Sequence, residues 1–124
     1  MKLGETRVKG RLYGPLGESE IEMLVDTGAT LTTLPEHTAR DLGIAVEEVV
    51  NVKLADGTVR QFGMGEVRLE LRNLRKTVGV LIVPETEEPL LGLTALELFR
   101  LKVNPVTREL EPSEYKLYAL VPSA

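Results

Sequence analysis

The sequence predicts an all-β, or mainly β, domain with about six to eight short strands and one or two short helices. In several segments apolar and polar residues alternate with a period of two, which is typical of half-buried strands. Leu (21 residues) and Val (14 residues) dominate the apolar side chains and aromatic residues make up only 4%, so we expect an aliphatic core. A length of 124 residues fits one domain, which we expect to span residues 1–124.

The first predicted strands lie in the N-terminal quarter of the chain. Val8 and Leu12 share one face while charged residues take the other, and Ile21, Met23 and Val25 repeat this pattern. These segments therefore predict two half-buried strands before residue 26.

A short helix and a hairpin are predicted next. The helix runs from Pro35 to Leu42, because Pro is favoured in a first helical turn and Gly43 just past the end. A strand from Val50 to Leu54 then meets Asp56-Gly57, which is a strong turn signal, and Thr58–Met64 returns as its partner.

The second half predicts two further strands and a second helix. Val67–Leu71 and Lys76–Val83 alternate as a strand pair. Thr94 is a suitable N-cap with Glu97 three residues later, so we expect a helix from Thr94 to Leu101 that begins with a capping box.

The C-terminal part carries turn signals rather than a long element. Asn104-Pro105 predicts a turn. Two short extended pieces are expected between Val106 and Leu120, with a break at Pro112.

Composition excludes most catalytic chemistry. The chain has no Cys, which excludes disulfides, thiolate metal sites and a Cys nucleophile. A single His, His37, weakens a Ser-His-acid triad or a His-based metal site, and we expect His37 to face solvent on the first helix. We therefore expect no metal and no cofactor, and chemistry by carboxylates if there is any.

Charge and hydropathy limit the partners and the location. A net charge of −4 and a pI near 5.1 argue against nucleic acid or an acidic membrane surface as a partner. No apolar run approaches the roughly 20 residues that a membrane helix needs. The first ten residues lack the apolar core of a signal peptide, so we expect a cytoplasmic protein.

One acid stands out by its position. The chain has only three Asp residues, and Asp26 directly follows the apolar strand that ends at Val25 and precedes Thr27-Gly28. Asp-Thr-Gly can be a simple turn in which the carboxylate binds local N–H groups, or it can hold a functional acid at the end of a strand.

The surrounding residues resemble a known family. The stretch Met23-Leu24-Val25-Asp26-Thr27-Gly28-Ala29-Thr30 resembles the active-site loop of the retroviral-type (retropepsin-like) aspartic peptidases. The hairpin at 50–64 lies where that family has its flap, and Leu90-Leu91-Gly92 leads into a helix as in its second half. Order and spacing match over residues 7–110, which leaves 111–124 as a C-terminal extension.

The resemblance implies a fold, an activity and a dimer. It implies a small closed β-barrel of the acid-protease type and hydrolysis of peptide or protein substrates by two carboxylates. Because this chain holds one Asp-Thr-Gly, the second carboxylate would come from Asp26 of another copy in a homodimer. Thr27 and Gly28 would support the loop. The substrate-binding residues that the resemblance implies are Gly28, Ala29, Thr30, Asp56, Gly57, Thr58, Ile82 and Leu90.

Two positions depart from the viral pattern. Viral enzymes have an acid two residues after the Gly of the motif and an Arg after the second Gly, and these two pair. Thr30 and Leu93 stand at those positions here, so the chain is more similar to cellular and prokaryotic single-domain members.

Other interpretations stay open at this point. The same fold could form a catalytically inactive dimeric binding or assembly module. The chain could also be a small β-barrel ligand binder that carries Asp-Thr-Gly by coincidence. The acidic run Glu85, Glu87 and Glu88 is either a solvated loop or a feature that favours basic substrate side chains.

Overall fold

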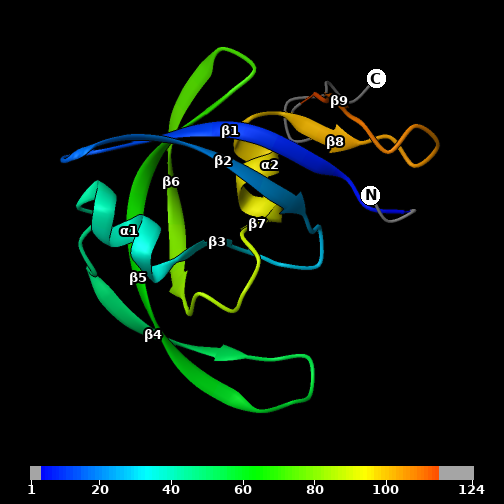
Figure 1. Cartoon of the computed structure of the whole chain (residues 1–124). Coiled ribbons are helices and arrows are strands. Elements are labelled where there is room, and N and C mark those ends of the chain that lie inside the picture. Colours follow the sequence, from blue (N-terminus) through cyan, green and yellow to red (C-terminus); the bar gives the residue numbers. More distant parts are fainter. Residues whose placement is uncertain (1–3, 115–124) are drawn as a thin grey trace, which may run out of the picture.

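Strands dominate the computed structural model of the chain, which describes residues 4–114 (Figure 1). In that part 52% of the residues are in strands and 12% are in helices, so the mainly β prediction is confirmed. Neither helix within residues 4–114 has the length and apolar character needed to cross a membrane.

The elements follow one another along the described chain in a fixed order. They are β1 (Arg7–Gly14), β2 (Gly17–Val25), β3 (Thr32–Pro35), α1 (Glu36–Leu42), β4 (Glu48–Lys53), β5 (Val59–Leu71), β6 (Leu74–Val83), β7 (Leu90–Leu91), α2 (Leu93–Leu98), β8 (Leu101–Val103) and β9 (Leu110–Pro112).

Most strands join one curved sheet in the order β3-β6-β5-β1-β2-β7, and β4 pairs with β5 outside this path. The β4–β5 hairpin extends away from the rest of the sheet at the bottom of Figure 1. β5 is one strand of 13 residues, where the sequence predicted two pieces, Thr58–Met64 and Val67–Leu71. Gly63 and Gly65 interrupt the apolar alternation that would have shown its continuity.

Two threonine hydroxyls close the sheet where its end strands β3 and β7 meet. Oγ1 of Thr33 accepts a hydrogen bond from the N–H of Leu90 (2.9 Å), and Oγ1 of Thr32 accepts one from the N–H of Gly92 (3.1 Å). Both threonines are buried. The predicted small closed barrel is confirmed as a nearly closed one, and side chains rather than a backbone ladder make the closure.

The core inside this sheet is aliphatic, as the composition predicted. Both helices and every strand except β4 contribute members, and Phe99 is the aromatic residue among them. The side chains with essentially no exposure include Leu12, Met23, Leu34, Leu69, Leu91 and Leu96.

The first helix agrees with its prediction apart from one residue. α1 ends at Leu42, and Gly43 adopts a left-handed conformation (φ 73°) that favours glycine. Pro35 is the N-cap and the last residue of β3 rather than a member of the first turn.

The predicted capping box of the second helix is wrong. α2 begins at Leu93 with Gly92 as the N-cap and no side-chain cap, so Thr94 lies inside the helix, and the chain is already in β8 at Leu101. The N–H groups of Leu93 and Thr94 instead donate to the backbone carbonyls of Ala29 (2.8 Å) and Thr30 (3.0 Å). A distant loop therefore satisfies the donors that a local side chain was expected to bind.

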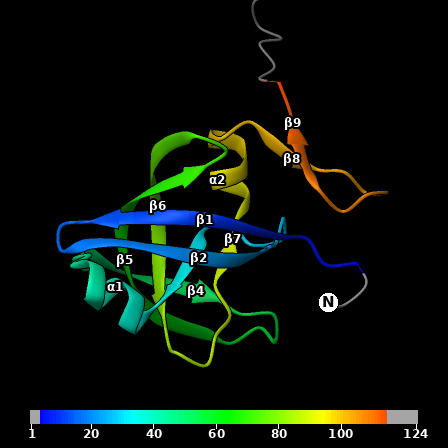
Figure 2. The same cartoon turned by 45° about the horizontal axis from the view of Figure 1, so that its top comes forward.

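The β8–β9 hairpin extends beside the main sheet (Figure 2). The predicted turn at Asn104-Pro105 is confirmed, and Oδ1 of Asn104 accepts from the N–H groups of Val106 and Thr107. The extended piece was predicted to begin at Val106, and this start is wrong. Residues 106–109 complete the turn, and β9 begins at Leu110. The remainder of the predicted second piece lies outside the described residues.

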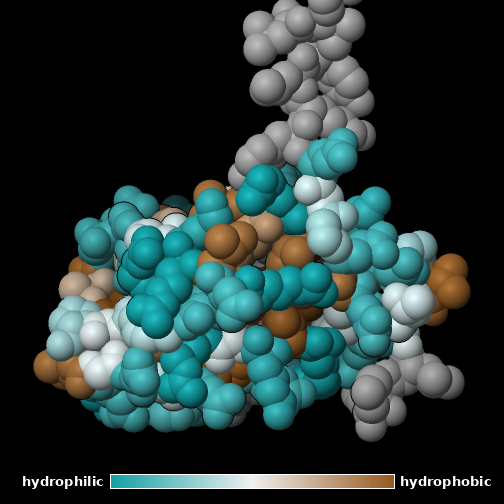
Figure 3. Space-filling model, turned by 90° about the horizontal axis from the view of Figure 1, so that it is seen from above, coloured by the Kyte–Doolittle hydropathy of each residue, from teal (hydrophilic) through white to brown (hydrophobic). Residues whose placement is uncertain are grey.

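The surface is mostly hydrophilic on the face that Figure 3 shows, with separate apolar areas. Single exposed apolar residues of this kind are normal for a soluble fold. The large apolar residues that are exposed in the described part of the chain are Leu16, Val46, Val49, Val59, Leu74, Leu93 and Val106.

Gly92→Ala should destabilise the protein because the chain leaves no room for a side chain there. A Cβ at Gly92 would lie 2.5 Å from the carbonyl carbon of Leu31, and backbone cannot give way as a side-chain end can. We expect a loss of about 1–3 kcal/mol in the free energy of unfolding, measured with urea. Gly79→Ala is the matched control, since its methyl would meet only the end of Met64 at 3.0 Å. Equal stability of the two variants would contradict this account.

Thr32→Val should also destabilise the fold, because the valine fills the same space without the hydroxyl. The buried N–H of Gly92 would lose the partner that the structure gives it, at a cost of about 1–3 kcal/mol. Thr94→Val, at an exposed position of α2, should change the free energy of unfolding by less than about 0.5 kcal/mol. Denaturant unfolding of both variants measures the difference, and a neutral Thr32→Val would show that the hydroxyl does not close the sheet.

Candidate active site

Asp26 is the first residue of the Asp26 loop (residues 26–31), which connects β2 to β3. Its N–H donates to the carbonyl of Leu91 (3.0 Å), and its own carbonyl accepts from the N–H of Ala29 (3.1 Å). Oδ1 accepts from the N–H of Gly28 at 2.9 Å. The half-buried carboxylate is therefore held at both its backbone and its side chain.

The segment from Pro89 to Thr94 holds the whole Asp26 loop. β7 pairs in parallel with the end of β2, and the first N–H groups of α2 donate to the loop carbonyls of Ala29 and Thr30. The loop therefore hydrogen-bonds to this segment on both sides of Gly92, which packs against Leu31. This arrangement fixes the direction in which Asp26 points.

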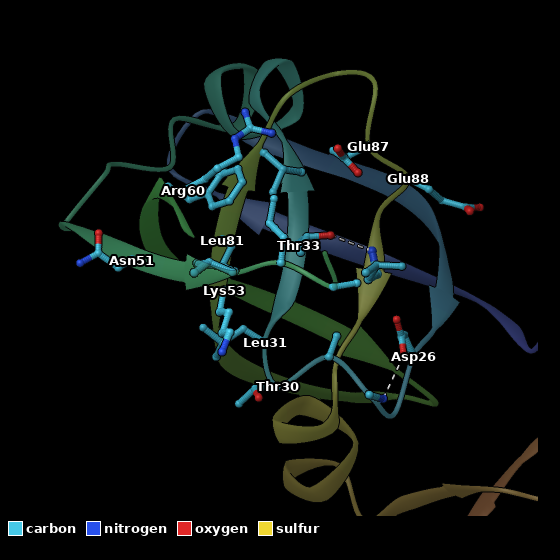
Figure 4. A pocket seen from close by; sticks show the side chains of 18 residues that line it. Asp26, Thr30, Leu31, Thr33, Asn51, Lys53, Arg60, Leu81, Glu87 and Glu88 are labelled. Atoms are coloured by element: carbon cyan, nitrogen blue, oxygen red, sulfur yellow. Dashed lines mark hydrogen bonds between the residues drawn. The ribbon is translucent and has the colours of Figure 1, made fainter. Parts of the chain in front are cut away.

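Asp26 opens onto a cleft of about 580 Å³ between the Asp26 loop and the β4–β5 hairpin (Figure 4). The segment between β6 and β7 forms a third side of the cleft. The lining residues are Asp26, Gly28, Ala29, Thr30, Leu31, Thr33, Asn51, Val52, Lys53, Leu54, Ala55, Arg60, Phe62, Leu81, Val83, Glu87, Glu88 and Leu90.

Of the ten catalytic, loop-support and substrate-binding residues that the resemblance implied, the structure brings five to this cleft. They are Asp26, Gly28, Ala29, Thr30 and Leu90. Thr27 is exposed on the loop and does not line the cleft. Leu81 and Val83 form the β6 wall in place of Ile82, because strand alternation turns Ile82 to the other face.

The tip of the hairpin lies outside the lining of the cleft. Asp56, Gly57 and Thr58 do not line it, although Ala55 and Leu54 next to them do. Gly57 has a positive φ of 88°, as a tight hairpin turn requires. Oδ1 of Asp56 accepts from the N–H (2.9 Å) and the hydroxyl (2.6 Å) of Thr58, so the tip is ordered by its own hydrogen bonds.

Sequence reasoning missed the hairpin residues that face the cleft. Arg60 lies directly opposite Val52 in the β4–β5 register, and Phe62 lies opposite Val50. Side chains opposite each other in an antiparallel pair share a face. The predicted apolar face of β4, once paired with β5, could have identified both residues.

Acidic residues line the side of the cleft next to Asp26. Glu87 and Glu88 both do so, and Figure 4 shows Glu88 pointing away from Asp26. The side chain of Glu88 pairs with the guanidinium of Arg7, which also contacts Glu5 at 3.2 Å. Glu85 instead binds the N–H (2.6 Å) and the ring of His37, which is exposed as predicted.

The chemistry available to this cleft is that of a carboxylate. Within residues 4–114 no group of His, Cys, Asp and Glu has the arrangement of a metal site. Of the three Asp residues of the chain, Asp26 alone lines the cleft, while Asp41 is exposed on α1. A fixed, half-exposed carboxylate of this kind can accept a proton from water that enters the cleft.

Comparisons with known proteins agree with this geometry. A family model described as "gag-polyprotein putative aspartyl protease" matches residues 14–98, more than half of the chain. A retropepsin-like aspartic protease from Rickettsia conorii is similar in structure, with a TM-score of 0.62 and 17% identity over 84% of this chain and 80% of its own. The protease of Simian Foamy Virus (mac) has a TM-score of 0.57 and 18% identity over 76% of this chain and 94% of its own. No curated protein sequence matches the chain.

The tip of the β4–β5 hairpin should stay ordered in mild acid. The hydroxyl of Thr58, and after it the backbone N–H, holds the pKa of Asp56 below its usual value. Because the pKa of Asp56 is lower in the folded state, these bonds are intact at any pH above its pKa in the unfolded chain, about 3.9. They are lost as the pH falls through its pKa in the folded state. NMR signals of the Thr58 amide should therefore change only below pH of about 3.9. A change centred well above that pH would contradict the assignment, and Asp56→Asn should remove the titration.

Proposed function

The chain belongs to the retropepsin-like aspartyl protease family, as the residues around Asp26 predicted, and we propose that it is an aspartic endopeptidase that works as a homodimer. The observation that carries the proposal is the carboxylate of Asp26, which is held by the N–H of Gly28 and opens onto a cleft large enough for an extended peptide.

Hydrolysis of a peptide bond by this chemistry needs two carboxylates close together. One is ionised and takes a proton from water, and the other is protonated and supports the carbonyl oxygen. Two like charges at such a distance cannot both ionise, so the carboxylates of an aspartic protease share one proton. Water attacks directly, and no covalent intermediate is needed.

The second carboxylate would come from a second copy of the chain. Asp41 and Asp56 do not line the cleft. Glu88 is engaged by Arg7, and within residues 4–114 no acid hydrogen-bonds to Asp26. A two-fold axis beside the Asp26 loop would bring two equivalent carboxylates together. Thr27 is exposed on that loop, and we propose that its hydroxyl binds the loop of the second copy.

The surrounding residues would then bind the substrate. Gly28 has only Oδ1 of Asp26 near its missing Cβ, at 3.2 Å, so the backbone there is open to a substrate strand. Ala29, Thr30 and Leu90 line the same floor. The β4–β5 hairpin would close over the peptide and exclude water, with Asp56, Gly57 and Thr58 at its tip.

The same fold could instead serve as an inactive dimeric binding module. Both interpretations require the cleft and the dimer, so they differ only in hydrolysis. A protease of this type should be inhibited by pepstatin-like peptides. The tetrahedral carbon that carries their hydroxyl group resembles the carbon of the hydrated amide. A binding module would bind peptides without cleaving them.

Asp26→Asn should abolish hydrolysis and leave the dimer folded. The amide oxygen of asparagine can still accept the hydrogen bond from Gly28, but the amide cannot take a proton from water. Cleavage of a peptide library by mass spectrometry measures activity, and sedimentation measures the dimer. Asp41→Asn, on the exposed side of α1, is the matched control and should keep full activity. Full activity of Asp26→Asn would contradict the mechanism.

A further inference from the structure

We infer that Arg60 makes the cleft selective for a substrate with an acidic side chain on the side of the β4–β5 hairpin. This inference rests on the proposed function, because it names the class of peptide that the same cleft would bind. The two sides of the cleft carry unequal charge.

Cations line the hairpin side. Arg60 and Lys53 belong to β5 and to the end of β4, and both line the cleft (Figure 4). Within residues 4–114 no carboxylate pairs with Arg60, whereas Arg7, Arg11 and Arg75 each have a glutamate partner. The charge of Arg60 is therefore available to a ligand.

Phe62 holds the guanidinium of Arg60 in place. The Cζ atom of Arg60 lies 5.3 Å from the centre of the Phe62 ring, and Phe62 itself is half-buried in the wall of the cleft. A guanidinium that rests on a ring has already lost part of its freedom, so it loses less entropy on binding. Its planar fork also matches both oxygens of a carboxylate, which the ammonium of Lys53 cannot do.

The opposite side of the cleft repels an acid. Asp26, Glu87 and Glu88 line it. The charge of Glu88 is paired with Arg7, whereas within the described residues no cation pairs with Glu87. An acidic side chain of the peptide would be unfavourable there and favourable beside Arg60. The electrostatic potential of the cleft therefore favours one orientation of the peptide. Side chains of an extended peptide alternate in direction, and one acidic residue can face the hairpin while its neighbours face the floor.

The test is cleavage of matched peptides that differ only by Glu or Gln at one position, scanned through the peptide. We expect wild-type kcat/KM to favour Glu by roughly tenfold at one position, as a charge-assisted hydrogen bond in a partly exposed cleft would give. Arg60→Gln should remove the preference, Arg60→Lys should keep part of it, and added salt should reduce it. Arg68→Gln, on the same strand outside the cleft, is the matched control and should keep the full preference.

The outcomes separate this inference from the proposed function. Cleavage with no Glu preference, or a preference that Arg60→Gln leaves intact, would overturn the role of Arg60 while the protease proposal stands. If no peptide is cleaved, the protease proposal fails, and binding of the same peptides to the protein by fluorescence anisotropy still decides the role of Arg60. A Kd that is about tenfold lower for Glu than for Gln, and equal in Arg60→Gln, would support it.

Discussion

The contact between the Asp26 loop and the segment from Pro89 to Thr94 determines the rest of the structure. Through this contact the end of β2 pairs with β7, and carbonyls of the loop accept from the first N–H groups of α2. Thr32 and Thr33 close the sheet against the same segment. Gly92 lies at its centre, where the backbone of Leu31 leaves no room for a side chain. Because hydrogen bonds reach the loop from both sides of Gly92, the loop cannot shift without breaking the closure of the sheet.

This contact also explains why the carboxylate of Asp26 is held in one position. The N–H groups of Gly28 and Asp26 are both used, one to hold the side chain and the other to hold the backbone to Leu91. The carboxylate is left half-buried in the lining of the cleft. A rigid support for half of a catalytic pair is what a protein needs if its partner must supply the other half.

The sequence predicted the parts of this arrangement that local rules control. Alternation found β1, β2 and β6, Gly43 marked the end of α1, and the residues around Asp26 indicated the family and the cleft floor. It did not reveal β3, since Thr32–Pro35 is buried on every side and has no alternation, and the supposed cap at Thr94 failed because the donors of α2 bind a loop distant in sequence. Arg60 and Phe62 were missed because their place in the cleft follows from the register of β5 with β4, and not from the pattern of either strand alone.

A mixing experiment tests most directly whether two copies of Asp26 form one catalytic site. Wild-type and Asp26→Asn chains would be combined in varying proportion at constant total concentration, allowed to exchange, and assayed for peptide cleavage. If each site needs a carboxylate from both chains, activity falls as the square of the wild-type fraction. Activity in direct proportion to that fraction would mean that one chain is a complete site, and it would contradict the shared carboxylate pair.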